Sequence, residues 1–248
     1  MASTSETGHA KNVANFQDLQ SFCTGYGAAY NPTKPTITLA ALTTKHTEAL
    51  AAQASLNSSQ PTLTNAVNQR EIIFTPLEKL ATRLQSAVAA SDVSAQFIND
   101  VKTLTRKLQG RRATPKKTPI PDNPATPQNE SSKSISASQL SYDSLVENFS
   151  KLIELLSAQP AYKPNETELT TAELTNLLNS MKAANTAVVD ATTVVSNARI
   201  SRNNVLYNET TGMLKVAETV KLYVKSVFTA SSPQYKQVSK IKFRPFSN

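Results

Sequence analysis

The sequence predicts an all-α fold built from two tandem four-helix modules that are related by internal duplication. Residues 30–74 align without a gap onto residues 162–206, and eleven of the aligned positions are identical. The chain has only 5 Gly among 248 residues, fewer than folds with many tight turns or phosphate loops require. Apolar residues recur in both halves at spacings of three, four and seven, the period of an amphipathic helix. A repeat of this length fixes an architecture but names no activity.

The duplication extends upstream of the aligned block. The pattern Val13-x-Asn15-Phe16-x-x-Leu19 recurs, one residue out of phase, as Val146-x-Asn148-Phe149-x-x-Leu152. Among the identical pairs, Arg70 and Arg202 allow two interpretations. They could be a duplicated contact with an anion or partner, or packing residues with a buried stem and a head in a salt bridge. We favour the packing interpretation.

Composition divides the chain into five segments. Each module of roughly 100 residues is long enough to bury a core of its own. The predicted segments are a flexible N-terminal segment at 1–10, a first module at 11–110, a linker rich in Pro, Ser and Lys at 111–137, a second module at 138–240, and a basic C-terminal arm at 241–248.

The first module is expected to contain a short helix followed by a long one. The short helix should cover about 12–27, and the long helix should begin near Thr38 and carry an apolar stripe to Ile73. Pro61 lies within that stripe. Because Pro removes a backbone hydrogen bond and clashes with the preceding turn, it is expected to kink or restart the helix.

Two further helices should complete the first module. Thr75, Pro76 and Glu78 form a start signal for the third, with Thr as N-cap and Pro at the first helical position. Ser91 and Asp92 are expected to open the fourth, and Gly110 to end it.

The second module repeats this plan without a Pro in its long helix. Helices are predicted over about 139–158, 171–208 and 212–229, and Ser232-Pro233 should start a short last one. Large and small apolar residues alternate along the long central helix, which suits close packing in an antiparallel bundle or coiled coil. Between the modules, five Pro at 115–127 exclude a helix and favour a semi-rigid, extended linker.

The residues needed for catalysis are scarce. The chain has two His and one Cys, and it shows no motif for nucleophilic, metal-dependent or nucleotide chemistry. Cys23 is expected to be a buried core residue. The sequence therefore predicts no enzyme, cofactor, metal site or small-molecule substrate. A polar N-terminus and the lack of a long apolar run favour a cytoplasmic protein, with export by a leaderless route left open.

Basic charge is the stronger functional signal, since the net charge is +8. Residues 101–117 carry seven Lys and Arg and no acid, and residues 201–248 carry eight against two Glu. Such clusters attract phosphate backbones or acidic surfaces, although cations also simply favour helix C-termini and tails. The candidate contacts for an anionic partner are Arg106, Lys107, Arg111, Arg112, Lys236, Lys240, Lys242 and Arg244.

The last residues alternate in character. From Lys240 to Phe246, basic and apolar side chains follow one another with a period of two. This pattern is typical of an extended arm with one face on a surface and the other charged, and a frayed tail is the alternative.

Two segments carry a family resemblance. Arg106-Lys-Leu-Gln-Gly-Arg-Arg112 and Ser231-Ser-Pro-Gln-Tyr-Lys-Gln-Val238 resemble the last helices of uncharacterised bacterial proteins with a duplicated helical module. The resemblance covers most of both modules. It implies the same fold, and it implies no activity and no functional residues.

Three functions remain open. The first hypothesis is a non-enzymatic structural or self-assembling interaction protein, whose modules pair like a homodimer fused by its linker. The alternative is non-specific binding of nucleic acid or another anionic polymer through the basic ends. A membrane-active helical protein ranks third, because the apolar stripes are modest and rich in Ala.

Overall fold

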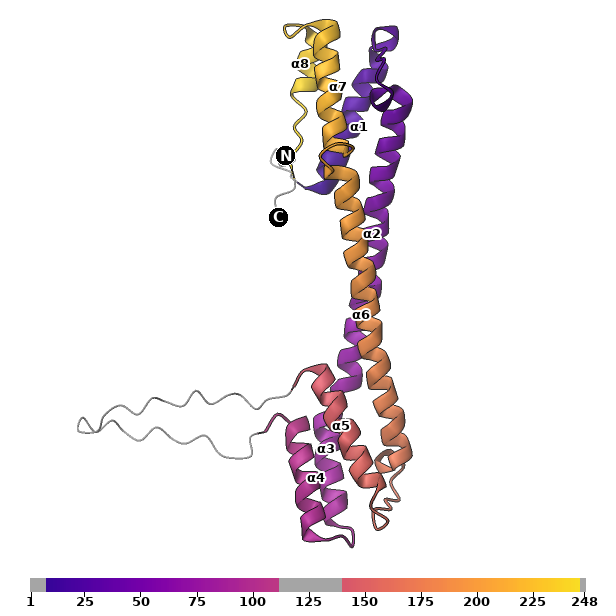
Figure 1. The fold of residues 1–248 in the computed structure, drawn as a ribbon, viewed down its shortest axis with the longest axis vertical. Coiled ribbons are helices and arrows are strands. Elements are labelled where there is room, and N and C mark those ends of the chain that lie inside the picture. The colour runs from indigo at the N-terminus through magenta and orange to yellow at the C-terminus, as the bar shows by residue number, and fades with distance from the viewer. Residues whose placement is uncertain (1–7, 112–139, 246–248) are drawn as a thin grey trace, which may run out of the picture. The chain divides into compact units, whose positions relative to one another are not determined.

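The computed structural model describes residues 8–111 and 140–245, and this described part contains helices and no strand (Figure 1). The all-α prediction is confirmed. The α-helices are α1 His9–Gly25, α2 Leu39–Phe74, α3 Leu77–Ala89, α4 Ala95–Leu108, α5 Tyr142–Ser157, α6 Thr171–Tyr207, α7 Met213–Phe228 and α8 Pro233–Ser239. Three short 3₁₀ turns accompany them, η1 Gly27–Ala29, η2 Pro35–Ile37 and η3 Thr167–Leu169. The first seven residues, the linker from 112 and the last three residues of the arm lie outside the described residues.

The long helix of the first module does not restart at Pro61. α2 runs for 36 residues with Pro61 inside it. The proline deprives the carbonyl of Asn57 of its helical partner, but Asn57 and Pro61 are both exposed, so water can hydrate that carbonyl. The continuous long helix predicted for the second module is present as α6, with 37 residues.

The starts of α3 and α4 differ from the predicted ones. The Thr75 hydroxyl donates to the Glu71 carbonyl at 2.7 Å, so it belongs to the end of α2 and does not cap α3. The Ser91 hydroxyl likewise donates to the Ala87 carbonyl at 2.8 Å. The N-cap of α4 is Ser94, whose side chain accepts from the Phe97 N–H at 3.2 Å.

The end of α4 follows the prediction. Gly110 has a φ of 63°, in the left-handed region that a side chain disfavours. Its N–H donates to the Lys107 carbonyl at 3.2 Å, and the Arg111 N–H donates to the Arg106 carbonyl at 2.9 Å. This pair of bonds is a Schellman motif, which satisfies carbonyls at the helix end.

The chain forms two compact units that do not coincide with the predicted module boundaries. Unit 1 comprises residues 1–64 and 191–248, and unit 2 comprises residues 65–190. The difference arises because α2 and α6 each cross a unit boundary. Residues 39–64 of α2 lie in unit 1 and residues 65–74 in unit 2.

Unit 1 has a core contributed by both ends of the chain. Phe16 and Leu19 of α1 are fully buried, and so are Met213 and Val220 of α7. The buried residues of this core cluster are Val13, Phe16, Leu19, Cys23, Tyr30, Ile37, Leu42, Ala49, Leu206, Met213, Val216, Ala217, Val220, Val224 and Val238.

Unit 2 has a core of its own around α3, α4 and α5. Leu84 of α3, Val101 of α4 and Phe149 of α5 are fully buried there. The buried residues of this core cluster are Phe74, Leu77, Ala81, Leu84, Val88, Val101, Leu108, Phe149, Leu152, Ile153, Leu156, Tyr162, Leu169, Leu174, Leu178 and Met181.

Candidate anion-binding surface

The fold distributes charge unevenly between the two units. Unit 1 contains twelve Lys and Arg against five Asp and Glu in the sequence, whereas unit 2 contains fourteen against thirteen. With His neutral, unit 1 therefore carries +7 of the chain's net +8. Unit 1 is therefore the part of the chain that attracts anions more strongly.

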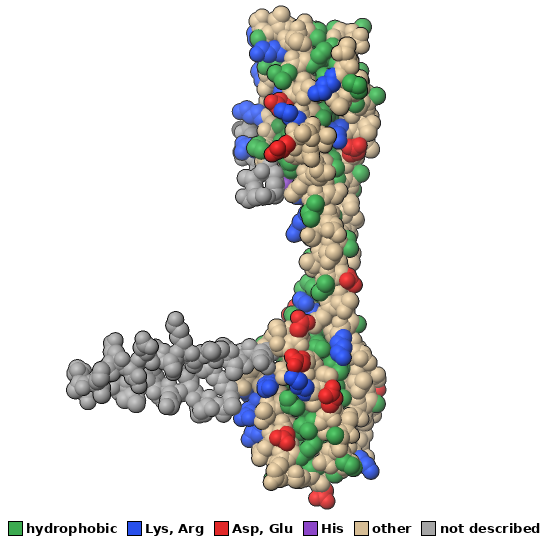
Figure 2. All heavy atoms as spheres, in the orientation of Figure 1, with side chains coloured by type: hydrophobic (Ala, Val, Ile, Leu, Met, Phe, Trp, Pro, Cys, Tyr) green, Lys and Arg blue, Asp and Glu red, His purple; other side chains and the backbone are tan. Residues whose placement is uncertain are grey.

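Seven cations of unit 1 lie on α7, on α8 with its C-cap, and on the C-terminal arm, and six of them remain when Lys215, which pairs with Glu218, is set apart. We call these six the basic surface, and they are Lys221, Lys225, Lys236, Lys240, Lys242 and Arg244. Figure 2 shows blue side chains over the part of unit 1 where Figure 1 draws α7 and α8. None of the six forms an ion pair with a carboxylate of the described residues. Two Glu of unit 1, Glu48 and Glu218, pair instead with other lysines of the unit.

Contacts within the unit bring Lys221 and Lys225 of α7 close to the arm and to α8. The Lys221 ammonium donates to the carbonyl of Ile241 and lies 5.1 Å from the centre of the Phe243 ring. One turn further along α7, the Lys225 ammonium lies 5.8 Å from the Tyr235 ring of α8. Lys221 is half-buried, and this burial lowers its pKa below the ordinary value. Lys221 and Lys225 therefore lie on the side of α7 that faces the arm and α8.

The described part of the C-terminal arm, residues 241–245, is extended and alternates as predicted. Ile241 and Phe243 pack against the core of unit 1, whereas Lys242 and Arg244 are exposed. The period of two thus places the apolar side chains on the protein and the charged ones in solvent. The frayed-tail alternative does not describe this segment.

Two asparagines of α1 fix the backbone of the arm. The buried Asn12 donates from Nδ2 to the Arg244 carbonyl at 2.8 Å, and its Oδ1 accepts from the Arg244 N–H at 3.0 Å. Asn15 donates from Nδ2 to the Lys242 carbonyl at 2.7 Å. Sequence reasoning missed Asn12, because an isolated asparagine on a helix carries no periodic signal that would mark it as a partner of a distant segment.

The predicted contacts in the first basic cluster lie in a different environment, within unit 2. Arg111 forms an ion pair with Glu78 at 3.4 Å, and Arg106 donates to the Thr103 hydroxyl at 3.2 Å. Lys151, and to a smaller degree Lys107, lower the pKa of the Glu147 carboxyl. Arg112 lies outside the described residues. The structure therefore brings a carboxylate to Arg111 and another near Lys107, unlike the basic surface of unit 1.

The duplicated arginines contact aromatic rings and amides. The Arg70 guanidinium lies 3.9 Å from the centre of the Tyr142 ring, a cation–π geometry. Arg202 donates to the Asn203 Oδ1 at 2.8 Å. Neither forms an ion pair with a carboxylate of the described residues, so the expected salt bridges are not found there.

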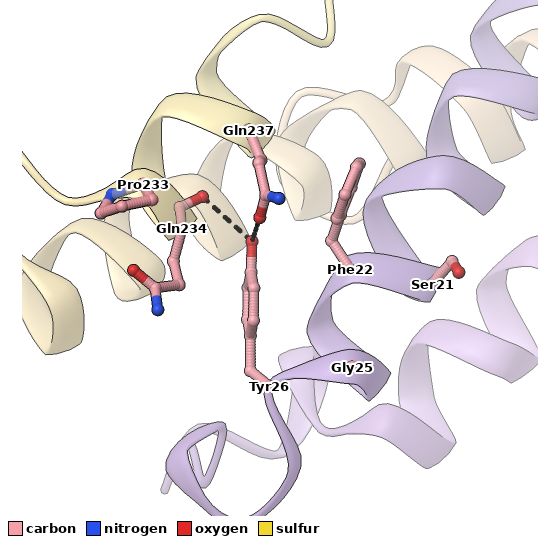
Figure 3. Close-up of a pocket in the computed structure, with 7 residues that line it drawn as sticks. All are labelled: Ser21, Phe22, Gly25, Tyr26, Pro233, Gln234 and Gln237. Atoms are coloured by element: carbon pink, nitrogen blue, oxygen red, sulfur yellow. Dashed lines mark hydrogen bonds between the residues drawn. The ribbon is translucent and has the colours of Figure 1, made fainter.

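A shallow pocket of about 360 Å³ lies between α1 and α8 in unit 1 (Figure 3). The Tyr26 hydroxyl donates to the Gln234 carbonyl at 3.0 Å across this pocket. Its lining contains no carboxylate, histidine, cysteine or lysine, so it offers no acid–base pair or nucleophile. The lining residues are Ser21, Phe22, Gly25, Tyr26, Pro233, Gln234 and Gln237.

The single cysteine of the chain lies in the core of unit 1. Cys23 is fully buried, and this burial raises its pKa to about 12, so its thiol stays protonated. No three His, Cys, Asp or Glu of the described part come together as a metal site. Within the described ranges, no helix has both the length and the apolar character needed to span a bilayer.

Comparison with known protein families, with curated proteins and with solved structures finds no match for this chain.

Proposed function

We propose that this chain is a non-enzymatic interaction protein that binds an anionic polymer, such as a nucleic-acid backbone, through the basic surface of unit 1. The observation that carries the proposal is the gathering of five Lys and one Arg on α7, α8 and the arm, with no ion pair to a described carboxylate. Uncompensated cations on one surface attract a polyanion and release its counterions on binding.

The side-chain chemistry favours contacts to phosphate over reading of bases. Lysine is a compact, hydrated point charge, whereas paired recognition of base edges or carboxylates relies on the planar fork of arginine. The aromatic rings near the surface, Tyr235 and Phe243, are partly buried against the core. Binding is therefore expected to tolerate any sequence.

The docked arm supports the proposal through preorganisation. Asn12 and Asn15 hold the backbone of the arm before any partner arrives. Because Lys242 and Arg244 project from a fixed backbone, less conformational entropy is lost on binding than a free tail would lose.

Fluorescence anisotropy with a labelled DNA duplex of arbitrary sequence tests this function. The test variant replaces Lys236, Lys240, Lys242 and Arg244 with Gln. The matched control replaces four exposed lysines of unit 2, Lys79, Lys102, Lys163 and Lys182, and so removes the same net charge. The test variant should lose at least about tenfold in affinity, and its salt slope should fall by about 3 to 4. Equal losses in both variants, or no binding by the unmodified chain at low salt, would contradict the proposal.

We also propose the finer fold description, two modules that follow one duplicated plan. Equivalent contacts support it. The Tyr30 hydroxyl donates to the Ile37 carbonyl at 2.6 Å, and the Tyr162 hydroxyl donates to the Leu169 carbonyl at 2.7 Å. The buried residues of α3 and α7 also share one spacing, from Leu77 to Val88 and from Met213 to Val224. Self-assembly, the first hypothesis from the sequence, stays a separate prediction, which light scattering of the free chain tests.

A further inference from the structure

Each compact unit is built from parts of both modules. The helices α1 to α4 belong to the first module and α5 to α8 to the second. Unit 1 nevertheless combines residues 1–64 with residues 191–248, and unit 2 takes everything between them. The division is reciprocal. Unit 1 contains α1 and the start of α2 from the first module. It also contains the end of α6 with α7 and α8 from the second module. Unit 2 contains the end of α2 with α3 and α4 from the first module, and α5 with the start of α6 from the second.

Buried contacts in unit 1 show this exchange at the level of side chains. Phe16 and Leu19 of the first module share a core with Met213 and Val220 of the second. Hydrogen bonds join the same two modules at the edge of this core. Tyr26 donates to the Gln234 carbonyl at 3.0 Å, and the Tyr223 hydroxyl of α7 accepts from the Asn31 N–H at 3.2 Å.

Unit 2 contains the converse contacts. Leu84 and Val101 of the first module share a core with Phe149 and Leu174 of the second. At its edge, the Tyr142 ring packs edge-on against Phe74 with 4.8 Å between ring centres, and the Arg70 guanidinium lies 3.9 Å from the centre of the Tyr142 ring. Arg83 also forms an ion pair with Glu168.

Equivalent helix ends make the exchanged contacts in the two units. In unit 2, Arg70 and Phe74 near the end of α2 meet Tyr142 at the start of α5. In unit 1, Tyr207 at the end of α6 meets His9 at the start of α1, with a ring-centre distance of 5.6 Å and Nδ1 2.7 Å from the tyrosine hydroxyl. In both units, the end of a long helix thus contacts the start of the first helix of the other module.

We infer that each module is the folding partner of the other, in the manner of two subunits that exchange segments, and that they hold together without a covalent link. A module alone retains only part of each core. Separating the two would remove from the core around Phe16 and Leu19, and from the core around Leu84 and Phe149, the buried residues that the other module supplies. Burial of this apolar surface is a large favourable term, so association of the modules and folding of the chain are one event. This inference is independent of the anion-binding proposal.

Cleavage of the full chain between the modules tests the inference. A protease recognition site is inserted after Asn123, in the segment between the described ranges, and the folded protein is cut in native buffer. The two fragments should elute together with the mass of the intact chain, and circular dichroism should show unchanged helix content. The uncut protein with the same insertion is the control.

Dilution of the cut chain distinguishes association from independent folding. The denaturant midpoint of the cut chain should fall with each tenfold dilution, because its unfolding separates two molecules, whereas that of the uncut control should not change. Fragments that elute separately as folded species, a midpoint that ignores dilution, or a loss of helix at every concentration would each overturn the inference.

A pair of variants in the cut chain adds a second readout. Asn12→Ala removes hydrogen bonds between the modules, whereas Gln20→Ala removes one bond to Thr43 within the first module, at 2.8 Å. Asn12→Ala should weaken association of the fragments by about tenfold, and Gln20→Ala should leave it unchanged. Equal effects would contradict the assignment of these contacts to the interface of the two modules.

Discussion

Asn12 binds both backbone groups of Arg244, 232 positions away in the chain. Its amide nitrogen donates to the Arg244 carbonyl at 2.8 Å, and its amide oxygen accepts from the Arg244 N–H at 3.0 Å. A neighbouring β-strand would satisfy an extended backbone in the same way. A single helical side chain thereby gives the arm the partner that its backbone needs.

Replacing Asn12 with Ala should release the arm. The change removes the hydrogen bonds that Asn12 makes to the N–H and carbonyl of Arg244. It should cost about 1 to 3 kcal/mol of unfolding free energy. Urea denaturation measures this cost, and hydrogen exchange at Lys242 and Arg244 should accelerate. Asn15→Ala is the matched control, because that exposed side chain makes one bond to the arm. Equal effects of the two variants would contradict the special role of Asn12.

The hydroxyls of Tyr30 and Tyr162 should contribute equally to stability. Each donates to a buried carbonyl seven residues later, so Tyr→Phe at either position should cost about 1 kcal/mol. The two losses should add in the double variant, because the residues lie in different units. Urea denaturation of the two single variants and the double variant checks this.

Tyr235→Phe serves as the control for these variants. Its hydroxyl makes no hydrogen bond within the described residues, so the change should alter stability by less than about 0.5 kcal/mol. If the double variant loses no more unfolding free energy than either single variant, the two tyrosines do not act independently.

The helices could be predicted from the sequence because their signals are local. The stripe from Leu174 to Val205, with no Pro within it, predicts a continuous helix over 171–208, and α6 covers Thr171–Tyr207. Gly110 ends α4 as predicted, because the positive φ of a helix cap depends on the identity of a single residue. The predicted restart of the helix at Pro61 is wrong, because the effect of this proline depends on the exposure of Asn57, which only the folded structure shows.

The pairing of the helices could not be predicted in the same way. The first helix has equivalent buried residues in the two modules, Phe16 and Phe149, and the third helix has Leu84 and Val220. Because these faces are alike, periodicity cannot tell whether the first helix packs on the third helix of its own module or on that of the other.

The candidate site was partly predictable for a related reason. A count of charges identified Lys236 to Arg244. It could not foresee that Glu78 would lie beside Arg111, because that pairing brings α3 to the end of α4. Charge density in the sequence locates a basic surface only where the fold brings no acid to it.

Stability should decline as the pH rises above about 9. The Cys23 thiol has an ordinary pKa of 9.0, and burial raises it to about 12 in the folded chain. The unfolded chain therefore loses the proton first, and the stabilisation is complete below pH 9 and is lost as the pH rises toward 12. Burial also raises the pKa values of Tyr30 and Tyr162 above their ordinary 10.0, which steepens the decline above pH 10.

Cys23→Ala isolates the contribution of the thiol. This variant starts from a lower stability, because it removes a buried sulfur atom. Its unfolding free energy should nevertheless fall less between about pH 8 and pH 10 than that of the unmodified chain. Urea midpoints across this range give the slope, and identical slopes in the two proteins would show that the thiol makes no contribution.

Gly110 and Gly25 should respond in opposite directions to the same substitution. Gly110 has a φ of 63°, and an added Cβ would lie 2.7 Å from Cδ1 of Leu140, so Gly110→Ala should cost about 1 kcal/mol. Gly25 is the last residue of α1, and a Cβ there would meet nothing within 4 Å. Because alanine restricts the unfolded chain, Gly25→Ala should be neutral or should stabilise by up to about 1 kcal/mol. Thermal denaturation of the two variants compares them directly, and a Gly110→Ala variant as stable as the Gly25→Ala variant would contradict the requirement for a left-handed cap at the end of α4.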